Sequence, residues 1–241
     1  EAISIWEHIV QQSPGYLPEV LLLSQCGESL PKVLNGEIDS DKLLRADKSS
    51  LFEQMLEVGP NYRSFNQALS SAVLTSVANW PSTQRCRILL IASYPAQISY
   101  ALLDALDNGQ TDLVIASDNA ANLSSIERTL DDIDWASAAV INLNQLDSSA
   151  FTAPFDFICI AHLLHESDNL PETLSSLKSL MNERAQLIIL ERSPDHVSDI
   201  MFGSQPDWWH ENQPRLMEPS NWLTLLSSAG FSNTSSLNEP D

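Results

Sequence analysis

The sequence predicts a doubly wound α/β domain that follows a helical segment. From Arg87 onward, short and continuously apolar runs alternate with longer stretches of helical spacing. Continuous apolar runs are typical of parallel strands covered on both faces, and the alternation is typical of βαβ units. In residues 1 to about 80, apolar side chains recur at helical spacing only. We therefore expect two parts, a helical part over 1–80 and an α/β part over 81–241.

Three stretches of the first part are expected to be helical, namely 5–10, 17–33 and 52–80. Each stretch gathers its apolar side chains on one helical face. Gly59 and Pro60 divide the last stretch, because proline lacks an N–H donor and clashes with the preceding helical turn. The charged segment around 36–49 is expected to be a loop.

In the second part, the apolar runs predict five strands: Ile88–Ala92, Leu113–Ala116, Ala138–Ile141, Phe157–Ala161 and Leu187–Leu190. Four helices are predicted between and after them: Ile98–Leu106, Asn122–Leu130, Glu172–Met181 and Trp222–Ala229. Gly230 suits the end of the last helix, since glycine readily takes the left-handed conformation that closes many helices. Phe231 would start a final short strand, and the serine-rich stretch 227–241 is expected to lead into a linker.

Composition excludes two classes of partner. With 12 Lys and Arg against 32 Asp and Glu in 241 residues, the formal net charge is −20. Such a chain repels nucleic-acid phosphates and anionic lipid headgroups, and no apolar run approaches the ~20 residues of a membrane span. The three cysteines lie far apart among apolar neighbours, and no basic segment typical of a signal peptide opens the chain. We expect a cytoplasmic protein without nucleic-acid or membrane partners.

Glycine is scarce in this chain. There are seven glycines, and Gly109 is the only one between Gly59 and Gly203. Neither G-x-G-x-x-G nor G-x-x-x-x-G-K can therefore occur. Both common glycine-cradled nucleotide sites are excluded on this ground.

Five segments of the chain carry distinctive motifs, and they lie in Pro18–Asp39, Gly59–Asn66, Pro154–Leu174, Leu187–Glu191 and Asp207–Phe231. Examples are LPKVLNGEID at 30–39, GPNYRSFN at 59–66 and PFDFICIAHLLH at 154–165. In this fixed order, the segments resemble the C-methyltransferase domains of modular polyketide synthases. The match spans nearly the whole chain, and its specificity lies in the order and spacing of the segments. The resemblance implies a doubly wound mixed sheet of the Rossmann-like, SAM-methyltransferase-like type, with an N-terminal helical lid over 1–80.

Active members of that family bind S-adenosylmethionine (SAM) at the first strand, loop and helix through a pattern like E-x-G-x-G-x-G. Its glycines let the backbone approach the cofactor closely. The matching positions of this chain hold neither the acid nor the glycines; they are Leu90, Ala92, Tyr94 and Ala96. Tyr94 and Pro95 are bulky and stiff where the cofactor would need room.

Two further cofactor-side features differ from the family. The acid that would hold the ribose hydroxyls should fall near Ala116–Ser117, and Asp118 comes one or two residues late. The family's Pro-Gly-Gly turn before the fifth strand is replaced by Glu183–Ala185. Together these losses predict a degenerate SAM site, so that we expect no cofactor and no metal.

The substrate side of the family's site is better kept. The resemblance implies a dyad of His165 and Glu191, in which the Glu orients the imidazole and the His removes the α-proton of a β-ketoacyl thioester. Tyr62 and Asn66 match lid positions that line the substrate pocket. The alternative is that the dyad survives only as a hydrogen-bonded pair in a collapsed pocket.

Three functions remain open at this point. The favoured one is a non-catalytic pseudo-methyltransferase domain of a polyketide synthase, a scaffold whose partners are the neighbouring domains. The alternative is an active SAM-dependent C-methyltransferase that acts on the α-carbon of a β-ketoacyl-carrier-protein intermediate. In the third, the dyad enolises a carrier-bound acyl chain without SAM. Acyl carrier protein is a further candidate partner, although the charge of −20 disfavours docking of an acidic protein.

Weaker patterns are assigned structural roles. The spacing of His162, His165 and Glu166 resembles a metal site, but a third strong ligand is missing. Many serines could be drawn into a hydrolase triad, yet the chain has no G-x-S-x-G elbow. Trp208 and Trp209 are expected to pack the lid against the core. The acidic run 131–134 is expected to be a solvated helix end.

Overall fold

The computed structural model describes residues 2–40, 49–146, 151–205, 208–210 and 213–237. The chain forms two compact units. The first comprises Glu1–Asn66 and Pro194–Arg215, and the second comprises Gln67–Ser193 and Leu216–Asp241. The division at residue 80 that the sequence suggested stays a prediction about domain organisation.

The first unit is mainly helical. Its elements are α1 (Ala2–Gln12), the 3-10 turn η1 (Pro14–Tyr16), α2 (Leu17–Leu34), α4 (Ser49–Val58), the start of α5 (Pro60–Ala78), α9 (His196–Phe202) and a hairpin of β6 (Trp209–His210) and β7 (Gln213–Pro214). The helix α2 packs against α4 and α9. Phe52 of α4 meets Phe202 of α9 edge-on, with ring centroids 5.3 Å apart. Cys26 of α2 donates from Sγ to the carbonyl of Met201 at 3.4 Å. Apolar contacts thus join α9 to the N-terminal helices despite its distance in sequence.

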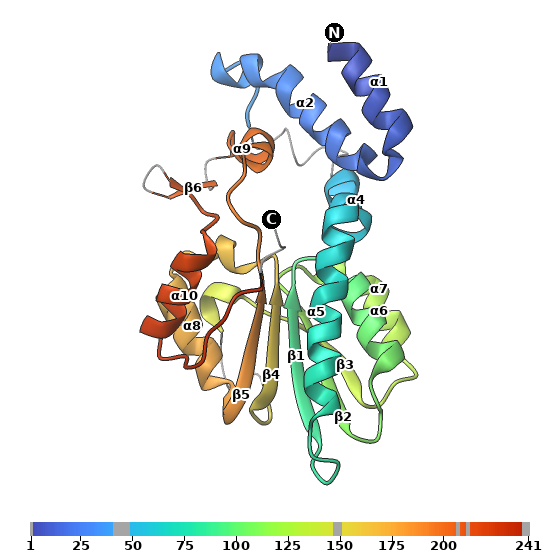
Figure 1. The fold of residues 1–241 in the computed structure, drawn as a ribbon, viewed down its shortest axis with the longest axis vertical. Coiled ribbons are helices and arrows are strands. Elements are labelled where there is room, and N and C mark those ends of the chain that lie inside the picture. The colour runs from blue at the N-terminus through green and yellow to red at the C-terminus, as the bar shows by residue number, and fades with distance from the viewer. Residues whose placement is uncertain (1, 41–48, 147–150, 206–207, 211–212, 238–241) are drawn as a thin grey trace. The chain divides into compact units, whose positions relative to one another are not determined.

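The second unit is built on a five-stranded parallel sheet. Its strands are β1 (Cys86–Ala92), β2 (Thr111–Ser117), β3 (Ala136–Val140), β4 (Phe155–Ala161) and β5 (Met181–Leu190), in the spatial order β3-β2-β1-β4-β5 (Figure 1). The central strand β1 pairs with β2 on one side and with β4 on the other. All seven residues of β4 are buried, as expected of a strand covered on both faces.

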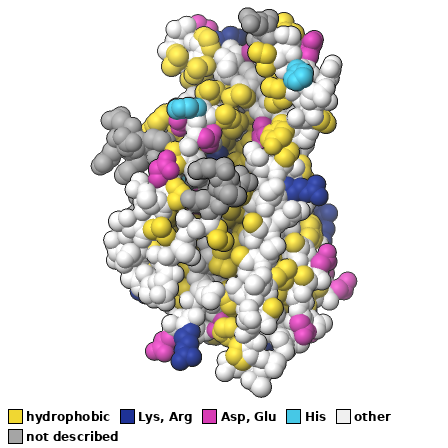
Figure 2. Space-filling view, in the orientation of Figure 1, with side chains coloured by type: hydrophobic (Ala, Val, Ile, Leu, Met, Phe, Trp, Pro, Cys, Tyr) yellow, Lys and Arg dark blue, Asp and Glu magenta, His cyan; other side chains and the backbone are white. Residues whose placement is uncertain are grey.

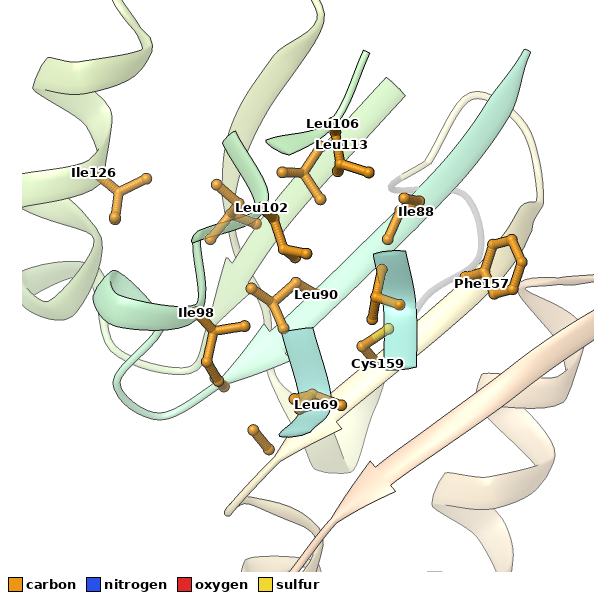
Figure 3. Close-up of a cluster of buried hydrophobic side chains, with 14 of the residues drawn as sticks. Leu69, Ile88, Leu90, Ile98, Leu102, Leu106, Leu113, Ile126, Phe157 and Cys159 are labelled. Carbon is orange, nitrogen blue, oxygen red and sulfur yellow. The ribbon is translucent and has the colours of Figure 1, made fainter. Parts of the chain in front are cut away.

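Helices cover both faces of this sheet. One face packs against the second half of α5 and against α6 (Ala96–Ala105) and α7 (Ala120–Leu130). Figure 3 shows this cluster, with Leu90 of β1 directed toward Ile98 and Leu102 of α6. The other face packs against α8 (Leu170–Ser179) and α10 (Pro219–Ser228). Two apolar cores, one on each side of the sheet, make the fold doubly wound.

The structure confirms the expected α/β architecture and most of its elements. All five predicted strands are present and extend beyond their predicted amino ends. The chain breaks between α4 and α5 at Gly59 and Pro60, as predicted. Gly230 follows α10 with a φ of +81°, the left-handed conformation expected at a helix end.

Three expectations for the strands were wrong. The main sheet is parallel throughout its described strands rather than mixed, and residues 231–237 after α10 form no strand. That stretch is rich in serine and asparagine, residues depleted from strands or prone to turns. Glu183–Ala185 is not a turn before the fifth strand but an irregularity within β5, because Phe155 pairs with Met181 and Phe157 with Gln186. Without proline or glycine there, the strand continues.

Two sequence expectations concern the chain's environment. Cys26, Cys86 and Cys159 are buried and form no disulfide, as expected. No described helix is both long and apolar enough to cross a membrane. Basic side chains occur at only a few places on the face of the molecule in Figure 2.

Candidate functional site

The candidate site lies where the parallel strands of the second unit end. In an open α/β sheet, ligands bind at the carboxyl ends of the strands where the strand order reverses. Here the order reverses between β1 and β4, since the chain runs outward from β1 to β3 and then returns to β4 beside β1. The loops after β1, β2, β4 and β5 therefore supply the relevant side chains.

His165 and Glu191 meet at this edge. His165 lies in the 3-10 turn η4 (Leu164–Glu166) after β4, and Glu191 directly follows β5. His165 Nδ1 lies 2.8 Å from Glu191 Oε2, and both side chains are buried. The other carboxylate oxygen, Oε1, accepts hydrogen bonds from the backbone N–H groups of Leu163 and Leu164 at 2.9 and 2.6 Å. The structure thus brings together the two residues that the resemblance paired.

The charge state of Glu191 follows from these contacts. Burial by itself raises the pKa of this carboxyl, but the adjacent His165, the hydrogen bond to its ring and the Leu164 amide outweigh burial and lower the pKa below its usual value. Because an ionised carboxylate can only accept, the contact with Glu191 Oε2 calls for a hydrogen on Nδ1 of His165, and in a neutral imidazole the acceptor is then Nε2. On that side, Nε2 lies 3.9 Å from Glu166 Oε1. The pair has the arrangement of an oriented general base.

His162 occupies the point where the chain leaves β4. It is one of two described non-glycine residues with positive φ, at 53°, and its side chain is buried. Its N–H donates to the carbonyl of Leu190 at 2.8 Å. Burial lowers the pKa of His162 to about 4, against a smaller opposing effect of Glu191. Among the described residues, no group of three or more His, Cys, Asp or Glu side chains could hold a metal ion.

The connection between β1 and α6 is short and internally bonded. It consists of Ser93, Tyr94 and Pro95. The carbonyl of Ser93 accepts hydrogen bonds from Ser117 Oγ at 3.2 Å and from Asn122 Nδ2 at 2.6 Å. In turn, Ser93 Oγ donates to the carbonyl of His162 at 3.4 Å. Side chains from β2 and α7 therefore fix the end of β1, and Ser93 links it to the end of β4.

The positions that match the family's cofactor pattern lie in or beside the apolar core. Leu90 is fully buried, and Ala92 and Ala96 are also buried. Tyr94 is half-buried. At the end of the second strand, Ala116 is fully buried in the sheet, opposite Ile91. Asp118, the nearest acid, is exposed and lies after the end of β2.

Tyr62 and Asn66, the two predicted substrate-pocket residues, belong to the first compact unit, whereas the dyad belongs to the second. Both are buried on α5. Asn66 Nδ2 donates to the carbonyl of Leu56 at 3.2 Å, across the α4–α5 junction. Their role in a substrate pocket stays a prediction.

The structure also shows the surroundings of Trp208 and Trp209 and of the acidic run 131–134. Trp208 is buried beside Phe202, and its Nε1 donates to Asp199 at 3.0 Å. Trp209 is 41% exposed, so the two side chains have different surroundings. The aspartates of 131–134 are exposed at the end of α7, as the sequence suggested.

Sequence reasoning missed the serine and asparagine side chains that fix the end of β1. Ser93 and Ser117 lie in stretches compared with the family's cofactor pattern, but no role was predicted for either side chain or for Asn122, and serine is common throughout the chain. Only the register of the sheet, in which Ile91 lies opposite Ala116, brings Ser117 close to Ser93. A local signal that could have located Asn122 is Asn119, a residue type that favours helix starts, since Asn119 caps α7 and Asn122 then falls in the first turn.

Comparison with known proteins gives a consistent result. A family model described as a methyltransferase domain matches residues 37–236. The non-reducing polyketide synthase Preu3 of Preussia isomera is 23% identical over 231 residues, which are 92% of this chain and 9% of that protein. The chain spans only about a tenth of the length of such curated relatives.

Solved structures share the fold. The CurJ carbon methyltransferase superposes with a TM-score of 0.85 and 22% identity, covering 100% of this chain and 67% of that chain. The CMeT domain of the citrinin polyketide synthase gives a TM-score of 0.82 and 16% identity, covering 94% of this chain and 62% of that one. Both similarities establish the Rossmann-like methyltransferase fold.

Proposed function

The chain belongs to the family of methyltransferase domains, and we propose that it is a non-catalytic member, a pseudo-methyltransferase domain of a polyketide synthase with a degenerate SAM site. Its role is then structural, as a scaffold between neighbouring domains of the same synthase. The similarity to polyketide synthases over 92% of the chain supports this setting.

The observation that carries the proposal is the conformation of the connection from β1 to α6. In a glycine-rich cofactor loop, glycines let the backbone approach the ligand and adopt conformations closed to other residues. Here no residue from Ser93 to Ala96 has a positive φ, because His162 and Asn233 are the only described non-glycine residues that do. The connection therefore lacks both the glycines and the glycine conformations.

The residues present do not fit SAM. A cofactor with a cationic sulfonium and a ribose diol is usually held by acids at the ends of the first two strands, as the family resemblance implies. At those positions Leu90 packs in the apolar core (Figure 3). Ala116 is fully buried in the core on the other side of the sheet. The carbonyl of Ser93 is already engaged by Ser117 and Asn122. We derive no step through SAM for this chain.

Isothermal titration calorimetry of the purified chain with SAM and with S-adenosylhomocysteine tests the proposal. We expect no binding heat from a protein that melts cooperatively. Micromolar binding of either compound would overturn the proposal. The informative comparison is the triple variant Ala92→Gly, Tyr94→Gly and Ala96→Gly, which restores the glycines of the family pattern. If this variant binds SAM and the wild type does not, the residues of the β1–α6 connection are what prevent binding.

A second function is favoured by one observation, the intact dyad. The alternative is a SAM-dependent C-methyltransferase acting on the α-carbon of a β-ketoacyl chain carried by acyl carrier protein. His165 and Glu191, 2.8 Å apart, would supply the base, with Nε2 accepting the α-proton. Methylation of such a substrate by the wild-type chain, abolished by His165→Ala, would establish this function. Its absence, beside a glycine-bearing relative that works under the same conditions, would exclude it.

A further inference from the structure

Glu191 does more in this structure than pair with a histidine. Its carboxylate bridges the end of β5 to the backbone that leaves β4, with Oε1 on two amides and Oε2 on the His165 ring. We propose that Glu191 is the anchor of the η4 turn and that this structural role is independent of any reaction.

The turn needs such an anchor because of its backbone. His162 takes a left-handed conformation, which crowds the β-carbon against the backbone in any residue other than glycine. The chain persists in such a conformation only where its surroundings hold it. Leu190, the last residue of β5, and Glu191, which follows it, stabilise this conformation by hydrogen bonds. The carbonyl of Leu190 accepts from the His162 N–H at 2.8 Å, and Glu191 takes the next two amides.

Burial makes this contact hard to replace. The Glu191 side chain is only 4% exposed, so its charge must be met by donors within the protein. It receives three, from Leu163 N–H, Leu164 N–H and the His165 ring. Removal of the carboxylate would leave two backbone amides without their acceptor in a buried setting, which costs more than the loss of a surface hydrogen bond. Removal of the imidazole leaves both amide contacts in place.

Three variants therefore separate anchoring from pairing. Glu191→Ala removes every acceptor. Glu191→Gln removes the charge but keeps a carbonyl oxygen for the amides. His165→Ala removes the ring alone. An anchor predicts that the turn loosens most in Glu191→Ala, less in Glu191→Gln and least in His165→Ala. If the amide contacts do not stabilise the turn, backbone protection should not differ among the three variants.

Amide hydrogen exchange at Leu163 and Leu164, followed by NMR on the whole chain without cofactor, measures this directly. We expect exchange in Glu191→Ala to rise by about 10- to 100-fold over wild type, as for loss of hydrogen bonds to a charged acceptor. His165→Ala should remain within a few-fold. The matched control is Glu166→Gln, which changes a neighbouring side chain that is 54% exposed. Unchanged exchange in Glu191→Ala, or an equal rise in His165→Ala, would overturn the proposal.

A second variant covers the case in which Glu191→Ala does not fold. Glu191→Asp keeps the charge but shortens the side chain by one methylene, which withdraws the carboxylate from the two amides. Faster exchange at Leu163 and Leu164 in this variant supports the anchor, and wild-type protection contradicts it. The readout involves no SAM, so it is distinct from the calorimetric test of the proposed function.

Discussion

The side-chain amide of Asn122 donates to the carbonyl of Ser93 at 2.6 Å, although 29 residues separate them. Ser117 adds a second hydrogen bond to the same carbonyl at 3.2 Å. The carbonyl that closes β1 is thereby held by the strand and the helix that follow it in the chain. Because both hydrogen bonds join separate elements of the second unit, they bear directly on its stability.

Replacement of Asn122 by Ala should lower the free energy of unfolding by about 1 kcal/mol, the usual net contribution of a partly buried hydrogen bond. Urea denaturation followed by circular dichroism measures the change. Ser124→Ala serves as the control, because Ser124 Oγ bonds only to Ala121 of its own helix on the exposed surface. An equal decrease in the free energy of unfolding in both variants would show that the Asn122–Ser93 hydrogen bond contributes no more than a hydrogen bond on the helix surface.

Leu90 belongs to the apolar core, so an acid at this position should destabilise the fold. Leu90→Ala should cost about 2–5 kcal/mol through the cavity that it leaves. Leu90→Glu should cost more, since it places a carboxyl among Ile98 and Leu102 without a partner (Figure 3). Thermal unfolding measures both, with Leu237→Ala as the control at a side chain that is 95% exposed. A folded, wild-type-like Leu90→Glu protein would refute this view of the position.

The stability of the fold should depend on pH through His162. Burial lowers the pKa of His162 to about 4, with Arg192 and His165 acting in the same direction and Glu191 against them. In the unfolded chain the pKa is ~6.5, so between these values the unfolded state binds the extra proton. The contribution of neutral His162 to the free energy of unfolding is therefore complete above pH ~6.5. It is lost as the pH falls toward 4, by at most about 1.4 kcal/mol per pH unit.

The His162→Asn variant isolates this effect, since asparagine tolerates the left-handed backbone but does not titrate. Denaturation curves of both proteins between pH 4.5 and 7 give the two slopes. We expect the unfolding free energy of the wild type to fall more steeply on acidification than that of the variant. Parallel slopes would mean that His162 titrates in the folded protein as it does in the unfolded chain.

Two glycines should respond to alanine in opposite directions. Gly230 has a φ of +81°, and an added Cβ would lie 2.6 Å from Lys178 Nζ. Gly230→Ala should therefore destabilise the chain by about 1 kcal/mol. Gly27 lies inside α2 with nothing within 4 Å of an added Cβ. Gly27→Ala should stabilise by up to about 1 kcal/mol, because alanine is the better helix former. Chemical denaturation of both variants checks the signs.

Local pattern was sufficient to locate most elements of the sheet. The apolar runs around Ile88–Ala92 and Phe157–Ala161 predicted buried strands, since each is short and apolar on both faces. Gly59 and Pro60 ended a helix for reasons contained within a few residues. The final strand at Phe231 failed because a single aromatic residue cannot outweigh the polar residues that follow it.

The sequence by itself determined the fold class, the loss of the glycine pattern and the pairing of His165 with Glu191, the last through resemblance. Only the tertiary structure decided what those residues contact. Strand register set Ser117 beside Ser93, and the parallel pairing of β4 with β5 set Glu191 beside Leu163 and Leu164. Spacing along a chain cannot reveal such contacts, because hydrogen bonds between strand ends depend on register, which the whole sheet fixes together.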